Sequence, residues 1–153
     1  MTDDIPSRCQ LMRQLAALRE RLREYGIRDA SDYAEVLVAE ALEGQRLASR
    51  VAKGHDVLAG LYGRVEVKCR QLPADGRVEE RVEIGAGKEA GFEYLAVVIF
   101  QPDFAIKGAV VVPYAAVWEL VAQQKYNRVS YSQACALPGS VDITAAVQAA
   151  AER

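Results

Sequence analysis

The chain has 153 residues, of which 51% are hydrophobic and 26% charged, as expected for a single soluble globular domain. Its formal net charge of -2 argues against a protein that coats nucleic acid through bulk positive charge, although a local basic face can still bind phosphates. The three cysteines have no paired spacing and His55 is the single histidine, which excludes a disulfide framework, a zinc cluster and histidine-rich metal sites.

Two amphipathic helices are predicted at the N-terminal end. The first ends at Gly26, and its apolar residues recur at steps of three and four, at Leu11, Leu15, Leu18, Leu22 and Tyr25. This stripe is suited to dock either on the rest of the domain or on a second copy of itself, and the sequence does not choose between them. The N-terminal helix is therefore a candidate homodimer surface.

The second helix is predicted to begin at a cap formed by Ser31 or Asp32 and to end near Gly44. Its buried arc comprises Ala34, Leu37, Val38, Ala41 and Leu42. Glu35 lies at the edge of this arc, whereas the other glutamates of the helix project away from it. Of the acids in this helix, Glu35 is the one expected to be held beside the core.

A β-hairpin is predicted next. Asp56 opens a short apolar run, the segment 60–63 supplies a tight turn, and RVEVKCR alternates charged and apolar residues. Arg64, Glu66, Lys68 and Arg70 share one face of that strand, and Val65, Val67 and Cys69 share the other, which is the predicted core side. Asp56 and Glu66 are expected side by side. The alternative is that the charged face is simply the solvated side of a sheet.

The remaining chain predicts a long loop over 71–91 with a short strand at 81–84, then apolar strands over 92–100 and 105–113. A helix is predicted to start after Pro113, with Val117, Trp118 and Val121 packed on the sheet. A strand over 128–132 and a short helix capped by Asp142 complete the chain.

This order predicts one α+β domain, with an N-terminal helix (1–28), a core (32–124) whose sheet has about four to five strands flanked by helices, and a C-terminal extension (125–153). The first ten residues do not resemble a signal peptide, and no apolar run is long enough to span a bilayer. The expected location is cytoplasmic, with no membrane partner.

The candidate site lies in the basic part of the chain. Between residues 46 and 70, six basic residues stand against two acidic ones: Arg46, Arg50, Lys53, Arg64, Lys68 and Arg70 against Asp56 and Glu66. Two carboxylates and an amine are suited to hold a divalent metal beside a phosphodiester. No recognition helix, zinc finger or aromatic strip predicts a base sequence.

The order of a helix bearing Glu35, then Asp56, then Glu66-Val67-Lys68 on the next strand resembles the PD-(D/E)XK, restriction-endonuclease-like nucleases, from about Asp32 to Gln124. His55 stands where that family often has a proline. The resemblance implies a restriction-endonuclease-like core and a metal-dependent endonuclease that hydrolyses DNA. Because the family includes inactive domains, a noncatalytic nuclease-like module that binds nucleic acid or a protein partner is the alternative.

The resemblance also implies roles for individual residues. Asp56, Glu66, Lys68 and Glu35 would be catalytic, and magnesium, or manganese in its place, would be held by Asp56, Glu66, Glu35 and the backbone carbonyl of Val67. Lys68 would lie by the attacking water and the scissile phosphate. The basic residues expected to contact DNA phosphates are Lys53, Arg70, Arg64 and Arg50, of which Lys53 and Arg70 are expected nearest the site.

Overall fold

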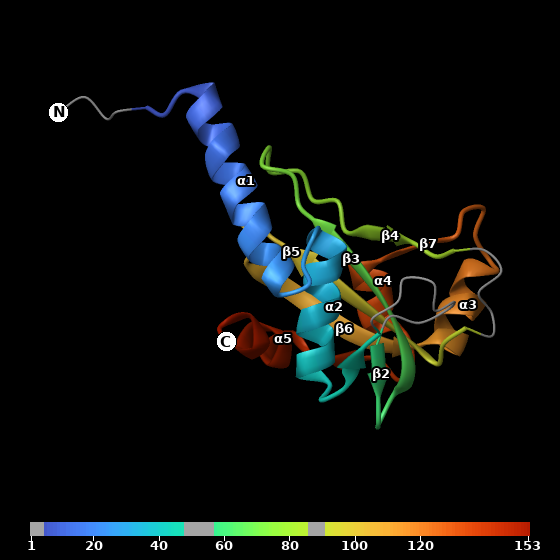
Figure 1. The fold of residues 1–153 in the computed structure, drawn as a ribbon. Helices are drawn as coiled ribbons and strands as arrows, with labels where there is room; N and C mark the ends of the chain where they lie inside the picture. The colour runs from blue at the N-terminus through green and yellow to red at the C-terminus, as the bar shows by residue number, and fades with distance from the viewer. Residues whose placement is uncertain (1–4, 48–56, 86–90) are drawn as a thin grey trace.

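The computed structural model describes residues 5–47, 57–85 and 91–153. Within them the elements occur in this order along the chain (Figure 1): α1 (Arg8–Glu24), α2 (Ala30–Ala41), β1 (Gln45–Arg46), β2 (Val57–Ala59), β3 (Gly63–Gln71), β4 (Arg81–Glu83), β5 (Tyr94–Phe100), β6 (Ile106–Pro113), α3 (Tyr114–Val121), β7 (Arg128–Ser130), α4 (Tyr131–Ala136), β8 (Val141–Asp142) and α5 (Thr144–Ala151). The predicted α+β class is confirmed.

The main sheet has six strands in the order β1-β2-β3-β5-β6-β8, and β4 pairs with β7 in a separate two-stranded ribbon. Strands β3 and β5 run parallel, while the other pairs in both sheets are antiparallel, so the main sheet is mixed as predicted. It exceeds the predicted four to five strands because β1 and β8 have two residues each. Strands that short carry no readable alternation.

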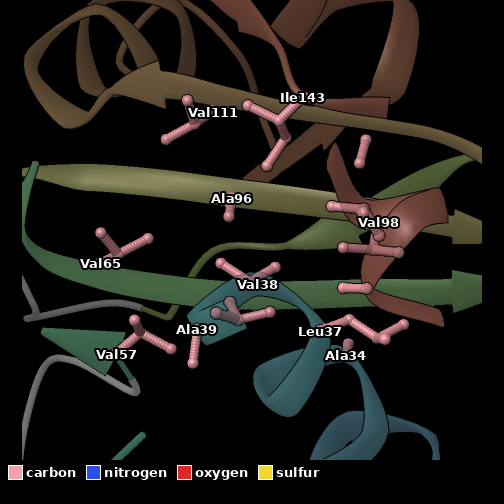
Figure 2. Close-up of a cluster of buried hydrophobic side chains, with 14 of the residues drawn as sticks. Ala34, Leu37, Val38, Ala39, Val57, Val65, Ala96, Val98, Val111 and Ile143 are labelled. Carbon is pink, nitrogen blue, oxygen red and sulfur yellow. The ribbon is translucent and has the colours of Figure 1, made fainter. Parts of the chain in front are cut away.

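A hydrophobic cluster covers each face of the sheet. On one face, α2 and α5 pack against Val65 and Val67 of β3 and the alternate residues of β5 and β6. Figure 2 shows Leu37 and Val38 of α2 among the side chains of this cluster. On the other face, Leu95 and Val97 of β5 pack with α3, α4 and the β4–β7 ribbon. The central strands are therefore buried on both sides, which explains their unbroken apolar sequence.

The C-terminal segment contributes to this core. Ile143, Val147 and Ala150 belong to the first cluster, Val129 and Ala134 belong to the second, and β8 pairs with β6 at the edge of the sheet. Asp142 accepts a hydrogen bond from the Thr144 N–H at 2.8 Å, but the N-cap of α5 is Ile143 rather than the predicted Asp142. Hydrophobic packing therefore continues to residue 150.

The cap of α2 differs from the prediction. Asp29, rather than Ser31 or Asp32, is the N-cap, and its carboxylate accepts a hydrogen bond from the Asp32 N–H at 2.9 Å. The Asp32 carboxylate reaches back to the Arg28 N–H at 2.9 Å. The helix therefore starts two residues earlier than expected, with Asp29 capping its first turn and Asp32 bonded to the residue before the cap.

Helix α1 projects from the body of the molecule (Figure 1). It begins at a capping box formed by Ser7 and Gln10, and none of its residues is buried. The apolar stripe predicted from Leu11 to Tyr25 is exposed along its length. Within the described ranges, no helix is long and apolar enough to cross a membrane.

Candidate functional site

The candidate site is built on β3, which the hairpin positions as predicted. Val57 of β2 is paired with Val65 and Ala59 with Gly63, and Gly63 closes the turn with a φ of 69°. A side chain at position 63 would be strained at that φ, and its Cβ would lie 2.7 Å from an oxygen of Glu93. The turn thus fixes which residues of β3 face each side of the sheet.

Glu66 is buried, with 2% of its surface exposed. Its register partner on β5 is Leu95, and that of Lys68 is Val97, both of which belong to the second hydrophobic cluster. Because paired residues on neighbouring strands share a face, Glu66 and Lys68 lie on the α3, α4 and β4–β7 side of the sheet. The charged face of β3 is therefore not a uniformly solvated one, and the solvated-face alternative is wrong for Glu66.

Lys68 contacts both the buried carboxylate and an open cavity. Its Nζ lies 3.4 Å from Glu66 Oε1, and its side chain is about a third exposed, at 32%. It lines a cavity of about 570 Å³ whose other walls come from the end of β4 and from residues 125–128. This placement gives the amine access to a ligand while one side of it faces Glu66.

Glu35 approaches the sheet from the opposite side. Its helix, α2, packs on the face that carries Val65 and Val67. The Glu35 carboxylate accepts a hydrogen bond from Arg46 Nε at 2.8 Å, and 18% of its side chain is exposed. The structure therefore brings Glu66 and Lys68 together and holds Glu35 with Arg46, beside the core as predicted.

The same arginine anchors a second buried carboxylate, Asp32, which is fully buried. Asp32 pairs with the guanidinium of Arg46 and with Arg28 Nε, the latter at 3.2 Å. Arg46 also donates to the carbonyl oxygen of Gly26 at 2.7 Å. This cluster of Arg28, Asp32, Glu35 and Arg46, the Arg46 clamp, joins the end of α1, the first turns of α2 and strand β1.

The basic residues on the charged face of β3 are paired near the surface. Arg64 Nη2 lies 3.0 Å from Glu93 Oε1, and Arg70 Nη2 lies 2.9 Å from Glu79 Oε1. The hydrogen bonds from Arg64 lower the pKa of Glu93, and the same pairing raises the pKa of Arg64. Both arginines are more than 40% exposed, so they remain open to an additional anion.

Burial also affects Cys69, on the Val65 side of β3. Desolvation raises the pKa of its thiol, and a hydrogen bond with Ser31 opposes that effect. A thiol with a raised pKa is a poor nucleophile at neutral pH. Cys69 therefore belongs to the packing of α2 on β3 and not to the chemistry of the opposite face.

Three predicted site residues, Asp56, Lys53 and Arg50, lie outside the described residues. Of the predicted metal donors, the described part contains Glu66, Glu35 and the peptide of Val67. Among the residues that the structure covers, no group of three or more His, Cys, Asp or Glu side chains could hold a metal ion. Glu66 supplies carboxylate oxygens beside an amine. Oxygen ligands of this type suit a magnesium ion, which keeps several of its coordinated waters when it binds to a protein.

Sequence reasoning missed the far wall of the cavity. Lys125, Tyr126 and Arg128 line it together with Lys68, although they lie more than fifty residues further along the chain. The signal was present as a basic and aromatic stretch, KYNR at 125–128, shortly after the end of α3. Its role depends on the fold, because β7 pairs with β4 and the stretch then lines a cavity together with Lys68 of β3.

Comparison with known proteins gives no family for this chain. A scan against protein-family models finds no match, and a search of curated proteins finds none either.

Proposed function

We propose that the protein is a metal-dependent endonuclease that hydrolyses DNA phosphodiester bonds at a site built around Glu66 and Lys68. One observation carries the proposal: the Glu66 carboxylate is 98% buried beside the Lys68 amine at 3.4 Å, and that amine also lines a large cavity. A site that hydrolyses a phosphodiester needs an anionic metal ligand and a cation at a common opening.

The energetics of burial support a functional role for Glu66. Transferring a carboxylate from water into a protein interior costs several kcal/mol, and about 20 kcal/mol in an idealised medium of low dielectric constant. A neighbouring cation offsets only part of that cost. The register partner of Glu66 is Leu95, and apolar residues surround it on the sheet. An apolar side chain at position 66 would be expected to pack at least as favourably. A buried acid whose neighbouring cation lines a cavity is therefore a candidate functional residue.

The proposed metal is magnesium, with manganese able to replace it. Glu66, Asp56 and the Val67 carbonyl would hold it, and Glu35 would support the site from the α2 side. Val57, the residue after Asp56, is paired with Val65, the residue before Glu66, so the described end of the hairpin is consistent with this set. When bound, the ion would lower the pKa of a coordinated water and offset charge on the phosphate.

The chain's own groups have distinct roles in this proposal. Lys68 donates a hydrogen bond to a phosphate oxygen or to the attacking water, while Glu66 holds the amine on the cavity side of β3. Arg64 and Arg70 on the same strand, with Lys53 and Arg50, provide contacts for DNA phosphates. The order of Glu35, Asp56, Glu66 and Lys68 along the chain supports a restriction-endonuclease-like core as part of this proposal.

The exposed stripe of α1 is proposed as a homodimer surface, because cleavage of both DNA strands is simplest with two sites. Leu11, Leu18 and Leu22 are each more than 40% exposed on it. Light scattering across a concentration series should show a dimer in the wild type and a monomer after Leu18→Glu. A wild-type chain that stays monomeric at every concentration would exclude this surface as a homodimer contact.

A cleavage assay tests the nuclease proposal. Plasmid, linear and branched DNA are incubated with magnesium, manganese or a chelator, using wild type, Glu66→Gln and Lys68→Ala. We expect metal-dependent cleavage that falls by at least about 100-fold in both variants.

Glu80→Gln and Lys107→Ala are matched controls for this assay. Glu80 and Lys107 form an ion pair of 2.7 Å away from the cavity, so the same chemical changes there should leave cleavage within about twofold of wild type. Metal-independent cleavage, or cleavage that is equal in wild type and Glu66→Gln, would contradict the proposal.

The second candidate is a noncatalytic nuclease-like module that binds nucleic acid or a protein partner. The observation that favours it is the Arg46 clamp, which already neutralises Glu35. Calorimetric titration separates the two candidates: the nuclease should bind manganese at millimolar affinity or better and lose that binding in Glu66→Gln. Wild-type protein that binds neither metal would favour the module.

A further inference from the structure

We propose that the cavity between Lys68 and the segment Lys125–Arg128 binds an unpaired nucleotide, with its base on Tyr126 and its phosphates on Lys125 and Arg128. The inference rests on the proposed nuclease function and specifies its substrate: a nucleic acid with a single-stranded segment beside the cleavage site. None of the residues 125–128 belongs to the proposed catalytic set.

The charge and size of the cavity fit a nucleotide. Lys68, Lys125 and Arg128 line it, and Glu83 is the one acid among its lining residues within the described chain. A smaller cavity of about 210 Å³ adjoins it and shares Lys125, Tyr126 and Arg128, with Arg81 as a further cation and no acid among its described lining residues. The larger volume, about 570 Å³, lies in the range typical of small-molecule sites.

Tyr126 has the properties of a stacking platform. Its side chain is 57% exposed, although it is a large aromatic residue that lines both cavities. The Lys125 ammonium lies 5.4 Å and the Arg128 guanidinium 5.2 Å from the centre of its ring. Exposed aromatic rings flanked by cations bind single-stranded nucleic acid by stacking bases while the cations bind the backbone.

The segment that carries Tyr126 is fixed to the ribbon. The Ile84 N–H donates to the Asn127 carbonyl at 2.8 Å, and Gln124 Nε2 donates to the Arg128 carbonyl at 2.8 Å. Strand β7 pairs with β4 from Arg128 to Ser130, and Arg128 Nε lies 3.6 Å from Glu83 Oε1. A platform held in this way loses little conformational entropy when a base stacks on it.

The geometry selects an unpaired base over a duplex. A base inside a double helix is covered on both faces by its neighbours, so it cannot stack on a protein ring without leaving the helix. Lys68 lines the same cavity, so a phosphate next to the stacked base would lie within reach of the proposed catalytic amine. The preferred substrate would therefore carry a single-stranded tail, gap or flap.

Fluorescence anisotropy tests the inference in a chelator, where cleavage does not occur. The probes are a labelled single strand of about 20 nucleotides, the matching blunt duplex, and that duplex with a single-stranded tail. We expect the wild type to bind the single strand and the tailed duplex at least about fivefold more tightly than the blunt duplex.

Substitutions at position 126 then locate the preference. Tyr126→Ala should weaken single-strand binding about tenfold and leave blunt-duplex binding unchanged, whereas Tyr126→Phe should keep the preference because it keeps the ring. Leu61→Ala, which truncates an apolar side chain that is 90% exposed in the turn of the β2–β3 hairpin and lines neither cavity, is the control and should change nothing. Lys125→Ala or Arg128→Ala should each reduce the slope of log binding constant against log salt concentration by about one, because one phosphate contact is lost.

Several outcomes would overturn the inference. These are equal affinity for single strand and duplex, a preference that survives Tyr126→Ala, no nucleic-acid binding, or tighter binding of an acidic peptide than of the single strand. Because affinity is measured without metal, these results are separate from the cleavage assay. A protein that cuts blunt duplexes without any preference would refute the unpaired-nucleotide site and leave the nuclease proposal standing.

Discussion

Two buried carboxylates on opposite sides of the molecule differ in their surroundings. Asp32 is fully buried and is held by the Arg28 N–H, the Arg28 side chain and Arg46, in a cluster that joins three elements. Glu66 is buried to nearly the same degree, but its neighbour Lys68 is partly exposed and lines a cavity. Burial alone therefore does not identify a functional acid. The distinguishing feature is whether the charge next to it faces other parts of the fold or an opening.

The largest effect on stability is expected from the Asp32 side of this comparison. Asp32→Ala would leave Glu35 as the remaining carboxylate partner of Arg46 in the clamp and would remove the acceptor of the Arg28 N–H. We expect the free energy of unfolding to fall by about 3–5 kcal/mol, as measured by urea denaturation. Asp75→Ala, at an aspartate paired with Arg77 in an exposed turn, should cost less than about 1 kcal/mol. Equal losses in both variants would show that the clamp is not structural.

Glu66→Gln should give the opposite pattern, with lost cleavage and little change in stability. The amide keeps the shape of the side chain and removes a buried charge, while Lys68 remains hydrated through its cavity. We expect the free energy of unfolding to stay within about 1 kcal/mol of wild type, while cleavage falls by at least about 100-fold. A loss of stability comparable to that of Asp32→Ala would place Glu66 with the structural acids.

Glu35 is intermediate, since it belongs to the clamp and is also proposed to support the metal site. Glu35→Gln keeps an oxygen for Arg46, so we expect a loss of about 1 kcal/mol in unfolding free energy. Cleavage should fall by about tenfold at most, as is typical of a group that acts through another. Cleavage as low as that of Glu66→Gln would contradict a supporting role for Glu35, which lies on the other face of the sheet from Glu66.

The smallest effect is expected from the exposed pair of Arg64 and Glu93, which extends the comparison to the surface. The hydrogen bonds from Arg64 lower the folded-state pKa of Glu93 below its unfolded value. Its contribution to stability is therefore present above the unfolded pKa and is lost as pH falls through the folded one. The difference in melting temperature between wild type and Glu93→Gln should shrink between pH about 6 and about 3. A difference that grows as pH falls would contradict this assignment.

The sequence was sufficient for the central elements. The alternation in RVEVKCR predicted which residues of β3 share a face, the glycines predicted the turn before it, and the apolar runs predicted β5 and β6. Each of these signals is local, because it depends on side chains within one strand or turn. The buried arc of α2 and the position of Glu35 at its edge were predicted in the same way.

The parts that could not be predicted depend on distant pairings. Nothing in the sequence near Glu66 shows that the ribbon of β4 and β7 covers its face, so the alternative of a solvated charged face could not be excluded from the sequence. The clamp required Arg46, whose partners lie eleven and fourteen residues earlier in the chain. For the same reason, the sequence predicted only a helix-capping role for Asp32 and no functional role for residues 125–128.

The parallel pairing of β3 with β5 has a consequence for the order of folding. The β2–β3 and β5–β6 hairpins close over short loops, but β3 and β5 must be joined across about 30 residues, at a greater cost in chain entropy. The ribbon of β4 and β7 spans a longer separation still. Lys68 therefore faces Tyr126 only after the slowest contacts have formed. During synthesis, the chain would acquire its hairpins well before it acquires a cavity that can hold a ligand.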